Sequence, residues 1–439
     1  MSLEVLGLIL LGCMLTFIFI GFPVSFCLII LGLVFGYIGF GDRVFYLITY
    51  QVFTTMEDYI LAAVTLFLFM GYLLERAGLM TRLFHAIQLL SGGMRGSLYL
   101  AALLSATLFA AATGIVTPGV VIIGLMAAPR MMASKYDARL SAGAITAGGT
   151  LGILIPPSIM LVVMGPILEV SIMRLFAGAF LPGFLLSSLF ISYCLIRSAL
   201  QPSVGPPLPP EERSPSILYS LRELLVGLIP ISTVILATLG SILTGFATPT
   251  EGAAIGCVGA LGLCIAYRQL NWATLKDAIF RTGESAAMIM ILLAASNFLG
   301  AVFSRLGTPG LIAEWMLGFH LPTMAYLGFI MVIIFILGWP LEWIPIVVII
   351  LPMFLPLVHA LGINMVWFSI VVATILQTCW LSPPVALSAY YIKSVAPEWS
   401  LGDIFWGMAQ FMVLQVIGVI LLLFLPQIVL FLPNLWYGS

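Results

Sequence analysis

Two stretches of the sequence place prolines, glycines and hydroxyl groups inside long apolar runs. Residues 148–158 read GGTLGILIPPS, and residues 378–384 read TCWLSPP. A proline removes a backbone donor and clashes with the preceding helical turn, so two adjacent prolines end a helix. In hydrocarbon the freed backbone groups need protein, water or an ion as partners. Each stretch therefore predicts a transmembrane helix that breaks inside the membrane, with a simple proline kink as the alternative.

A helix broken in mid-membrane offers two kinds of ligand. Its first half ends in carbonyl oxygens, which suit Na⁺, and its second half begins with amide donors, which suit an anion. Hard cations prefer such oxygen donors. The ion ligands expected in the two breaks, largely backbone groups, are Gly149, Pro156, Thr378 and Pro383. Ser158 and Ser382 are expected to line an adjacent substrate cavity.

Two more interruptions lie in the apolar runs that precede the breaks. Residues 97–129 are interrupted at 113–118, and residues 322–359 are interrupted at 338–340. Each arm has about 15 residues, which is too short for a straight helix across a hydrocarbon core of about 30 Å. We therefore predict two re-entrant helical hairpins whose tips reach the middle of the membrane.

The hairpin tips complete the predicted site. The tip residues expected to bind ions are Thr113, Gly114 and Gly338. The residues expected to face substrate are Thr117, Trp339 and Glu342. A carboxylate inside a span is costly and is therefore a functional candidate, although Glu342 could instead cap its own helix. Tight turns without a ligand, and a packing role for Trp339, are the alternatives. Glu251 is predicted to be a helix cap.

Composition places these segments in a membrane. Of the 439 residues, 62% are hydrophobic and 8% are charged, whereas soluble domains carry about 25% charged residues. The length allows roughly ten to twelve membrane crossings. The net charge of −1 gives no indication of a nucleic-acid partner. The six cysteines stand singly in apolar runs, which predicts neither a disulfide framework nor a metal site.

The chain divides near its middle at a proline-rich linker, residues 198–222. The predicted parts before it are helices in 1–76 and a segment 97–197, which holds the hairpin 97–129 and the broken helix 140–168. The predicted parts after it are helices in 223–303 and a segment 322–432, which holds the hairpin 322–359 and the broken helix 364–392. The fold class predicted is an all-α polytopic membrane protein built from two repeats.

The two halves match residue by residue at a nearly constant offset, which favours a duplication. The matched positions include Gly71 with Gly300, Arg76 with Arg305, Pro156 with Pro383 and Pro157 with Pro384. The helix count puts every Lys and Arg on one side except Arg43, Arg174 and Arg305, so the positive-inside rule makes that side cytoplasmic. Arg76 and its mate Arg305 then lie on opposite sides, which predicts inverted repeats.

With these residues in view, the chain resembles the large membrane subunit of tripartite ATP-independent periplasmic (TRAP) transporters, the DctM-like family. The stretches that carry the resemblance are GILIPPS at 152–158, SIMRLFAG at 171–178, Pro182-Gly183, ATPTE at 247–251 and Ser382-Pro383-Pro384. One departure lies at the first hairpin tip. Many members have Gly-x-Ser-Gly-Ser there, whereas residues 111–116 read AATGIV and Ile115 replaces the second serine.

The resemblance implies an elevator-type, Na⁺-coupled secondary transporter of the ion-transporter superfamily. In such proteins a transport domain, here 97–197 and 322–432, moves against scaffold helices, here 1–76 and 223–303. The resemblance also implies two partners, a small four-helix membrane subunit and a periplasmic substrate-binding protein. The expected location is the bacterial inner membrane, among membrane lipids.

We therefore predict a permease, not an enzyme, that imports a small carboxylate-type organic anion with Na⁺ as coupling ion and no other cofactor. The sequence contains no Walker A motif that would indicate ATP as the energy source. One alternative is a self-sufficient Na⁺/dicarboxylate carrier of the same superfamily, which needs no binding protein. A structural or assembly subunit is the alternative from another class, while an intramembrane enzyme lacks a convincing catalytic pair.

Overall fold

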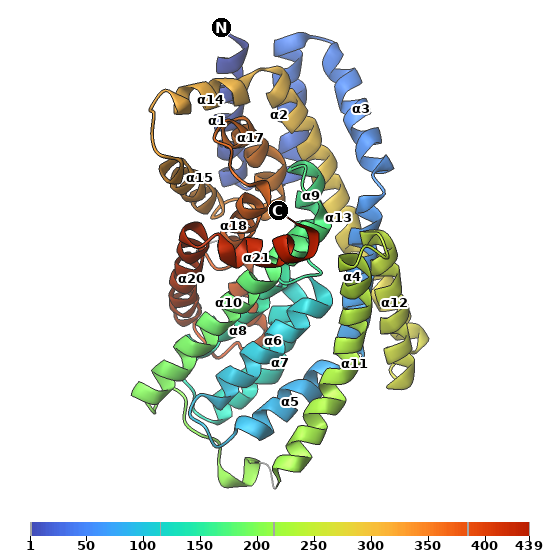
Figure 1. Cartoon of the computed structure of the whole chain (residues 1–439), viewed down its shortest axis with the longest axis vertical. Coiled ribbons are helices and arrows are strands. Elements are labelled where there is room, and N and C mark those ends of the chain that lie inside the picture. The colour runs from blue at the N-terminus through green and yellow to red at the C-terminus, as the bar shows by residue number, and fades with distance from the viewer. Residues whose placement is uncertain (1, 115, 214–215, 384–385, 439) are drawn as a thin grey trace.

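The computed structural model describes residues 2–114, 116–213, 216–383 and 386–438. Within these ranges every regular element is a helix (Figure 1). Seven of the described helices are long and apolar enough to cross a membrane, or eight when one bent pair is counted as a span. The sequence predicted more crossings because much of its apolar content lies in shorter helices of 10–17 residues. The chain is a multi-pass membrane protein.

The first half contains ten α-helices and one 3₁₀ turn among the described residues. They are α1 (Leu3–Ile20), α2 (Val24–Phe40), α3 (Arg43–Glu57), α4 (Ile60–Arg76), α5 (Leu79–Ser91), α6 (Ser97–Thr113), α7 (Val116–Ala133), α8 (Ala138–Thr150), η1 (Leu151–Ile153), α9 (Ile159–Ile167) and α10 (Ile172–Leu200). The predicted hairpin thus comprises α6 and α7, and the predicted broken helix comprises α8, η1 and α9.

The second half begins after a stretch whose described residues, 201–213, contain the 3₁₀ turn η2 (Pro210–Glu212) and no other helix. Its helices are α11 (Ile217–Leu243), α12 (Pro249–Ala266), α13 (Trp272–Arg305), α14 (Thr308–Leu317), α15 (Thr323–Leu337), α16 (Trp343–Pro345), the π-helical η3 (Ile346–Ile350), α17 (Leu351–Ala360), α18 (Met365–Leu376), η4 (Gln377–Trp380), α19 (Leu387–Val395), α20 (Leu401–Phe424) and α21 (Gln427–Tyr437). Both ends of the predicted linker 198–222 are helical, because α10 extends to Leu200 and α11 begins at Ile217.

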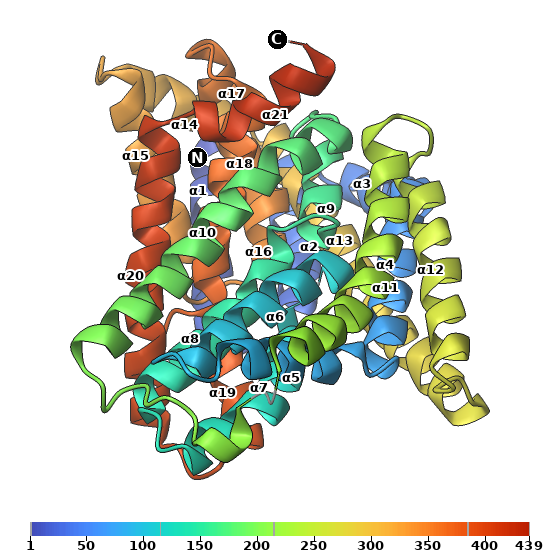
Figure 2. The same ribbon diagram turned by 60° about the horizontal axis from the view of Figure 1, so that its bottom comes forward.

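Helix lengths and ends agree with a duplicated chain. The bent pair α3 and α4 covers 43–76, and the single helix α13 covers the matching residues 272–305. The first copy bends by 54° where the side chain of Asp58 accepts a 2.9 Å hydrogen bond from the N–H of Ile60. The matched helices α5 and α14 lie toward opposite ends of the molecule (Figures 1 and 2), as inverted repeats require.

The helices pack into two groups. In one, α4 contacts α12 and α13, and α13 also contacts α2 and α3. In the other, α10 contacts α6, α18 and α20, and α8 contacts α7 and α20. The α4–α12 crossing is close because Cys257 and Cys264 are small, and their thiols donate to the carbonyls of Leu66 and Leu73 at 3.1 and 3.2 Å. Small residues at such crossings let helix backbones approach in a membrane.

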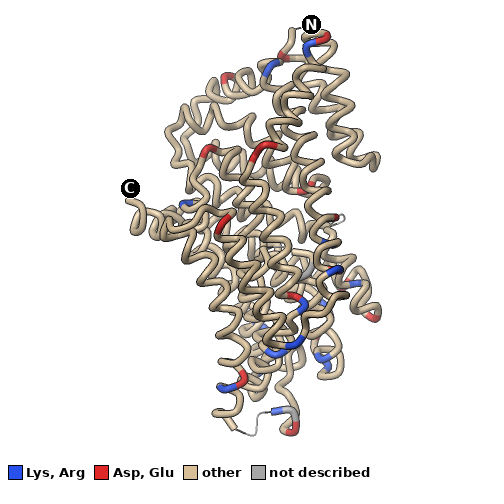
Figure 3. The backbone as a smooth tube through the Cα atoms, turned by 90° about the vertical axis from the view of Figure 1, so that its right-hand side faces the viewer, with Lys and Arg blue, Asp and Glu red and all other residues tan. Residues whose placement is uncertain are grey.

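Charged side chains gather at helix ends. Lys and Arg concentrate in the part of the molecule away from the N-terminus (Figure 3), as the predicted orientation requires. There, Arg76 pairs with Asp277 at 2.6 Å and Arg281 pairs with Glu75 at 3.2 Å, so the ends of α4 and α13 are joined. Glu251 caps α12 as predicted, in a reciprocal capping box with Thr248.

The crossing of α8 and α20 generates a first prediction. A methyl group on Gly407 would overlap the backbone oxygen of Arg139, and backbone cannot move aside as a flexible side chain can. Gly407→Ala should therefore destabilise the protein by about 1–3 kcal/mol or more, seen as a lower Tm in detergent.

The matched control lies in the same helix. A methyl group on Gly402 would meet its nearest neighbouring atom, the Ser400 Oγ, at 3.8 Å, which is ordinary contact. Gly402→Ala should leave the Tm unchanged or raise it slightly, because alanine favours helix. Equal effects of the two substitutions would contradict the close crossing.

Candidate substrate and ion site

The first break is stabilised by local hydrogen bonds. After α8 the chain makes the turn η1, and five residues separate η1 from the start of α9. Ser158 caps α9, since its hydroxyl accepts from the N–H of Leu161 at 3.4 Å and also donates to the carbonyl of Ile153. Ser158 is fully buried. The hydroxyl thus satisfies freed backbone groups on both sides of the break.

The second break has the same character. Helix α18 continues into the turn η4, and α19 begins at Leu387. The hydroxyl of Thr378 donates to the carbonyl of Ile375, and the hydroxyl of Ser382 donates to the carbonyl of Thr378, both at 2.6 Å. Thr378 and Ser382 are fully buried. Pro383 is partly buried, and Pro384 lies outside the described residues.

Each hairpin tip packs against the break of its own half. Gly114 has φ +64°, and a methyl group there would overlap the carbonyl oxygen of Pro157. In the second half, a methyl group on Gly338 would lie 2.7 Å from the Sγ of Cys379. Glycine is therefore needed at both tips for close approach. The tips and breaks predicted to form ion sites together are in contact.

One helix of each half crosses its own hairpin through a glycine. Gly71 of α4 lies against Thr113: a methyl group added to Gly71 would lie 3.2 Å from the Thr113 Cα. Gly300 of α13 lies against η3: a methyl group added to Gly300 would lie 3.3 Å from the carbonyl oxygen of Val348. Gly71 and Gly300 are matched positions of the two repeats. Both contacts therefore recur where the duplication predicts them.

A cavity of about 270 Å³ lies where these parts meet. Its walls come from both hairpin tips, both breaks, α4, α13 and α19. The polar side chains and tyrosine or tryptophan rings that line it are Tyr72, Thr117, Glu284, Ser285, Glu342, Trp343, Trp380 and Tyr391. Ile159 and Met160, in the first turn of α9, also line it. Polar groups that converge in a partly apolar hollow are typical of a ligand site.

Three of the predicted site residues line this cavity: Gly114, Thr117 and Glu342. The buried residues Thr113, Gly149 and Pro156 lie in the hairpin and break next to it. Ser158 and Ser382 are turned into their own breaks and do not line it. Trp339 is 41% exposed and packs edge-on against Phe335, with ring centroids 5.8 Å apart, away from the cavity lining. Ile115 lies outside the described residues.

Glu342 does not make the capping hydrogen bond that was the alternative to a cavity role. It occupies the N-cap position of α16, but its side chain forms no cap hydrogen bond. The carboxylate is partly exposed and lines the cavity.

No residue of the cavity wall formed by α4 and α13 was among the predicted site residues. The hydroxyls of Tyr72 and Ser285 are 2.8 Å apart and join α4 to α13 beside the cavity. Glu284 precedes Ser285 and also lines it. A carboxylate at the start of a predicted span was the available signal for Glu284. No sequence signal showed that α4 and α13 form one wall.

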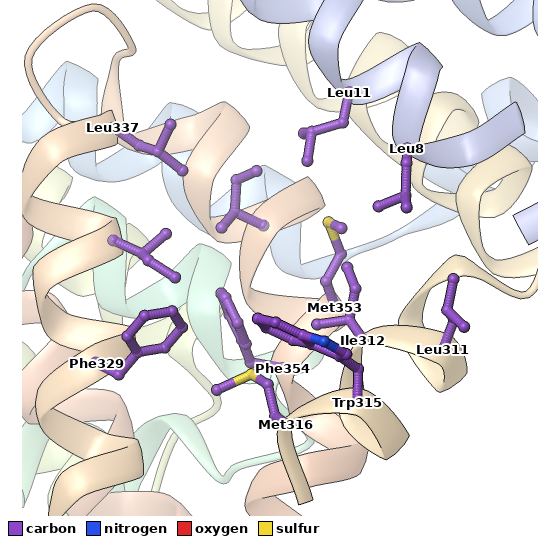
Figure 4. A pocket seen from close by; sticks show the side chains of 12 residues that line it. Leu8, Leu11, Leu311, Ile312, Trp315, Met316, Phe329, Leu337, Met353 and Phe354 are labelled. Atoms are coloured by element: carbon purple, nitrogen blue, oxygen red, sulfur yellow. The ribbon is translucent and has the colours of Figure 1, made fainter. Parts of the chain in front are cut away.

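A second, larger cavity of about 460 Å³ lies between α1, α14, α15 and α17 (Figure 4). Its lining consists of Leu, Ile, Met, Phe and Trp side chains, including Leu8, Trp315, Phe329 and Met353. Burying a carboxylate among such side chains without a partner would cost several kcal/mol. The smaller cavity is therefore the better candidate for a polar solute.

Comparison with known proteins identifies the family. The family model described as the DctM component of the tripartite ATP-independent periplasmic transporter matches residues 11–428. The chain belongs to the DctM family of TRAP transporters.

Relatives in this family carry permease names. The chain is 29% identical to the C4-dicarboxylate TRAP transporter large permease protein DctM of Pseudomonas aeruginosa, over 88% of this chain and 89% of that protein. It is 26% identical to the sialic acid TRAP transporter large permease protein SiaM of Vibrio cholerae, over 96% and 97% of the two chains.

Two further matches are a longer relative and a solved structure. The isethionate TRAP transporter permease protein DctMQ of Oleidesulfovibrio alaskensis is 28% identical over 78% of this chain but only 53% of its own length. Among solved structures, the YdaH transporter of Alcanivorax borkumensis superposes with a TM-score of 0.63 at 16% identity, over 88% of this chain and 89% of that one. This DctM-family chain therefore shares its fold with a transporter of distant sequence.

The contact between the first tip and the first break generates a second prediction. Gly114→Ala places a side chain on a left-handed residue, at about 1–2 kcal/mol, and also overlaps the carbonyl oxygen of Pro157. In detergent, Gly114→Ala should lower the Tm by more than the left-handed backbone conformation alone would.

Gly78→Ala is the matched control. Gly78 has φ +71° and open space where the methyl group would lie, so it carries the backbone cost without the overlap. Equal decreases in Tm for Gly114→Ala and Gly78→Ala would contradict the prediction, because they would show that the hairpin tip does not touch the break.

Proposed function

We propose that this chain is the large permease subunit of a Na⁺-coupled, binding-protein-dependent TRAP transporter. It imports a small carboxylate-type organic anion across the bacterial inner membrane by an elevator mechanism. Its partners are a small four-helix membrane subunit and a periplasmic substrate-binding protein. The relatives named for C4-dicarboxylates, sialic acid and isethionate support an organic acid as substrate.

The observation that carries the proposal is the cavity at the meeting point of both tips and both breaks. A solute there touches the hairpins and broken helices on one side and α4 and α13 on the other. Movement of the first group along the second would carry the solute with it. The lining residues Tyr72 and Glu284 lie near the helix ends that carry Arg76 and Arg281. In the predicted orientation these ends of α4 and α13 are on the cytoplasmic side.

The donor groups at the tips and breaks support Na⁺ as the coupling ion. The first proposed site combines Thr113, Gly114, Gly149 and Pro156, and the second combines Gly338, Thr378 and Pro383. The hydroxyl of Thr113 donates to the carbonyl of Phe109 at 3.1 Å, and that of Thr378 donates to Ile375. In each case the proton is engaged and the oxygen lone pairs are free to bind a cation. Oxygen ligands of this kind suit a hard cation.

Na⁺ should stabilise the purified protein more than K⁺ does. Thr113→Val and Thr378→Val each remove one hydroxyl ligand, so each should raise the NaCl concentration for half-maximal stabilisation about tenfold, the equivalent of about 1.4 kcal/mol. The measurement is Tm against NaCl, with KCl added to keep ionic strength constant.

Thr374→Val provides the control for helix stability. Thr374 lies one turn before the break, is buried, and donates to the carbonyl of Ile370 at 2.7 Å in the same manner as Thr378. Its loss should lower Tm without changing the NaCl dependence. Stabilisation by KCl equal to that by NaCl would rule out the proposed ion sites.

A further inference from the structure

The candidate cavity has an unusual charge for a site that receives an acid. Glu284 and Glu342 both line it, and no Lys or Arg is among its described lining residues. The Glu342 carboxylate forms neither a hydrogen bond nor an ion pair with a described residue. In a partly dry site, two negative charges a few ångströms apart repel each other by several kcal/mol. A substrate with a second carboxylate would therefore be repelled by the glutamates of the cavity.

Basic groups near the cavity are already paired. The guanidinium of Arg281 lies 5.8 Å from the centre of the Tyr72 ring, but its nitrogens bind Glu75 at 3.2 Å and Asp277 at 3.4 Å. Arg76 binds the same Asp277. These cations neutralise carboxylates at the helix ends and do not line the cavity. The charge of Glu342 is therefore not offset by a neighbouring base.

The cavity also offers unpaired donors. The hydroxyl of Ser158 accepts from Leu161, which leaves the N–H groups of Ile159 and Met160 in the first turn of α9 without an intrahelical acceptor. The indole nitrogen of Trp380, a residue of the cavity wall, is buried and has no hydrogen-bond partner among the described residues. An unpaired buried donor is costly, so both features favour a ligand with an acceptor group. One substrate carboxylate satisfies this need.

Aromatic rings complete the pattern. Tyr72, Trp343, Trp380 and Tyr391 line the same cavity as the two glutamates. Faces of such rings attract ammonium groups. The lining therefore combines donors for one carboxylate with acceptors and rings for one cation.

We propose that the cavity selects a small zwitterion, a carboxylate whose other end carries an ammonium group, and that Glu342 is the residue that determines this choice. The carboxylate binds the donors of α9 and Trp380, and the ammonium group binds Glu342. The volume of about 270 Å³ fits a small metabolite of this kind. The inference rests on the proposed function, because it takes this cavity as the substrate site; it keeps the carboxylate proposed there but makes the substrate neutral overall rather than an anion.

Two probes of similar length separate a zwitterion from a dicarboxylate: 4-aminobutyrate and succinate. Binding to the purified permease in lipid nanodiscs is measured by calorimetry in NaCl. The wild type should bind 4-aminobutyrate at least about tenfold more tightly than succinate. Glu342→Gln should weaken 4-aminobutyrate about tenfold and leave succinate unchanged or tighter, because one charge-assisted hydrogen bond is lost and one repulsion is relieved.

Two other variants test whether the effect is specific to Glu342. Glu284→Gln should reduce the preference in the same direction but less, since Glu284 is the more exposed of the two. Glu314→Gln, on the exposed surface of α14 and outside the cavity, should change neither affinity. Equal or tighter succinate binding in the wild type, binding of neither probe, or equal weakening of both probes by Glu342→Gln would overturn the proposal. Na⁺-dependent stabilisation would persist in these cases, so the proposed coupling would stand independently.

Discussion

The fold depends on one constraint: a backbone group exposed in hydrocarbon must find a partner. Two helices stop inside the apolar interior, and each stop is closed by the same means. A short 3₁₀ turn follows the first half, and buried hydroxyls from Ser158, Thr378 and Ser382 bond to nearby backbone. A hairpin tip then packs over each break, which requires glycine at 114 and at 338. The cavity exists because these four interruptions lie at one place.

The two repeats contribute different chemistry to that place. The first half supplies the amides of α9 and the hydroxyl of Thr117, which are groups that meet an acceptor. The second half supplies Glu342 and the indoles of Trp343 and Trp380. The remaining wall is made by α4 and α13, which are themselves matched helices. Matched positions such as Gly71 and Gly300 thus make similar contacts in the two halves, while different side chains make the two sides of the cavity chemically unequal.

Much of this architecture was predictable from the sequence, because prolines and glycines act locally. Described helices end close to Pro156-Pro157 and to the interruptions at 113–118 and 338–340. Of the residues predicted to face substrate, Thr117 and Glu342 line the cavity; Gly114, predicted as an ion ligand, lines it too. Side-chain direction was not predictable. A helix that is apolar on every face has no periodicity to orient it, so Trp339 was expected at the cavity and Tyr72 was not. The inward turn of Ser158 also depends on the geometry of the break.

The glycine contacts at 71 and 300 bear on the proposed elevator mechanism, in which the two helix groups would move past each other. Helices usually interlock, with side chains of one filling grooves of the other, and a shift along the axis must lift each out of its groove. At these two crossings α4 and α13 present no side chain. Opposite Gly71 lie the Cα, Cβ and carbonyl oxygen of Thr113, and opposite Gly300 lies the carbonyl oxygen of Val348. At these two positions no side chain of α4 or α13 has to be lifted out of a groove. In the proposed mechanism, these contacts would hold the two groups together while adding no interlocked side chain at either point.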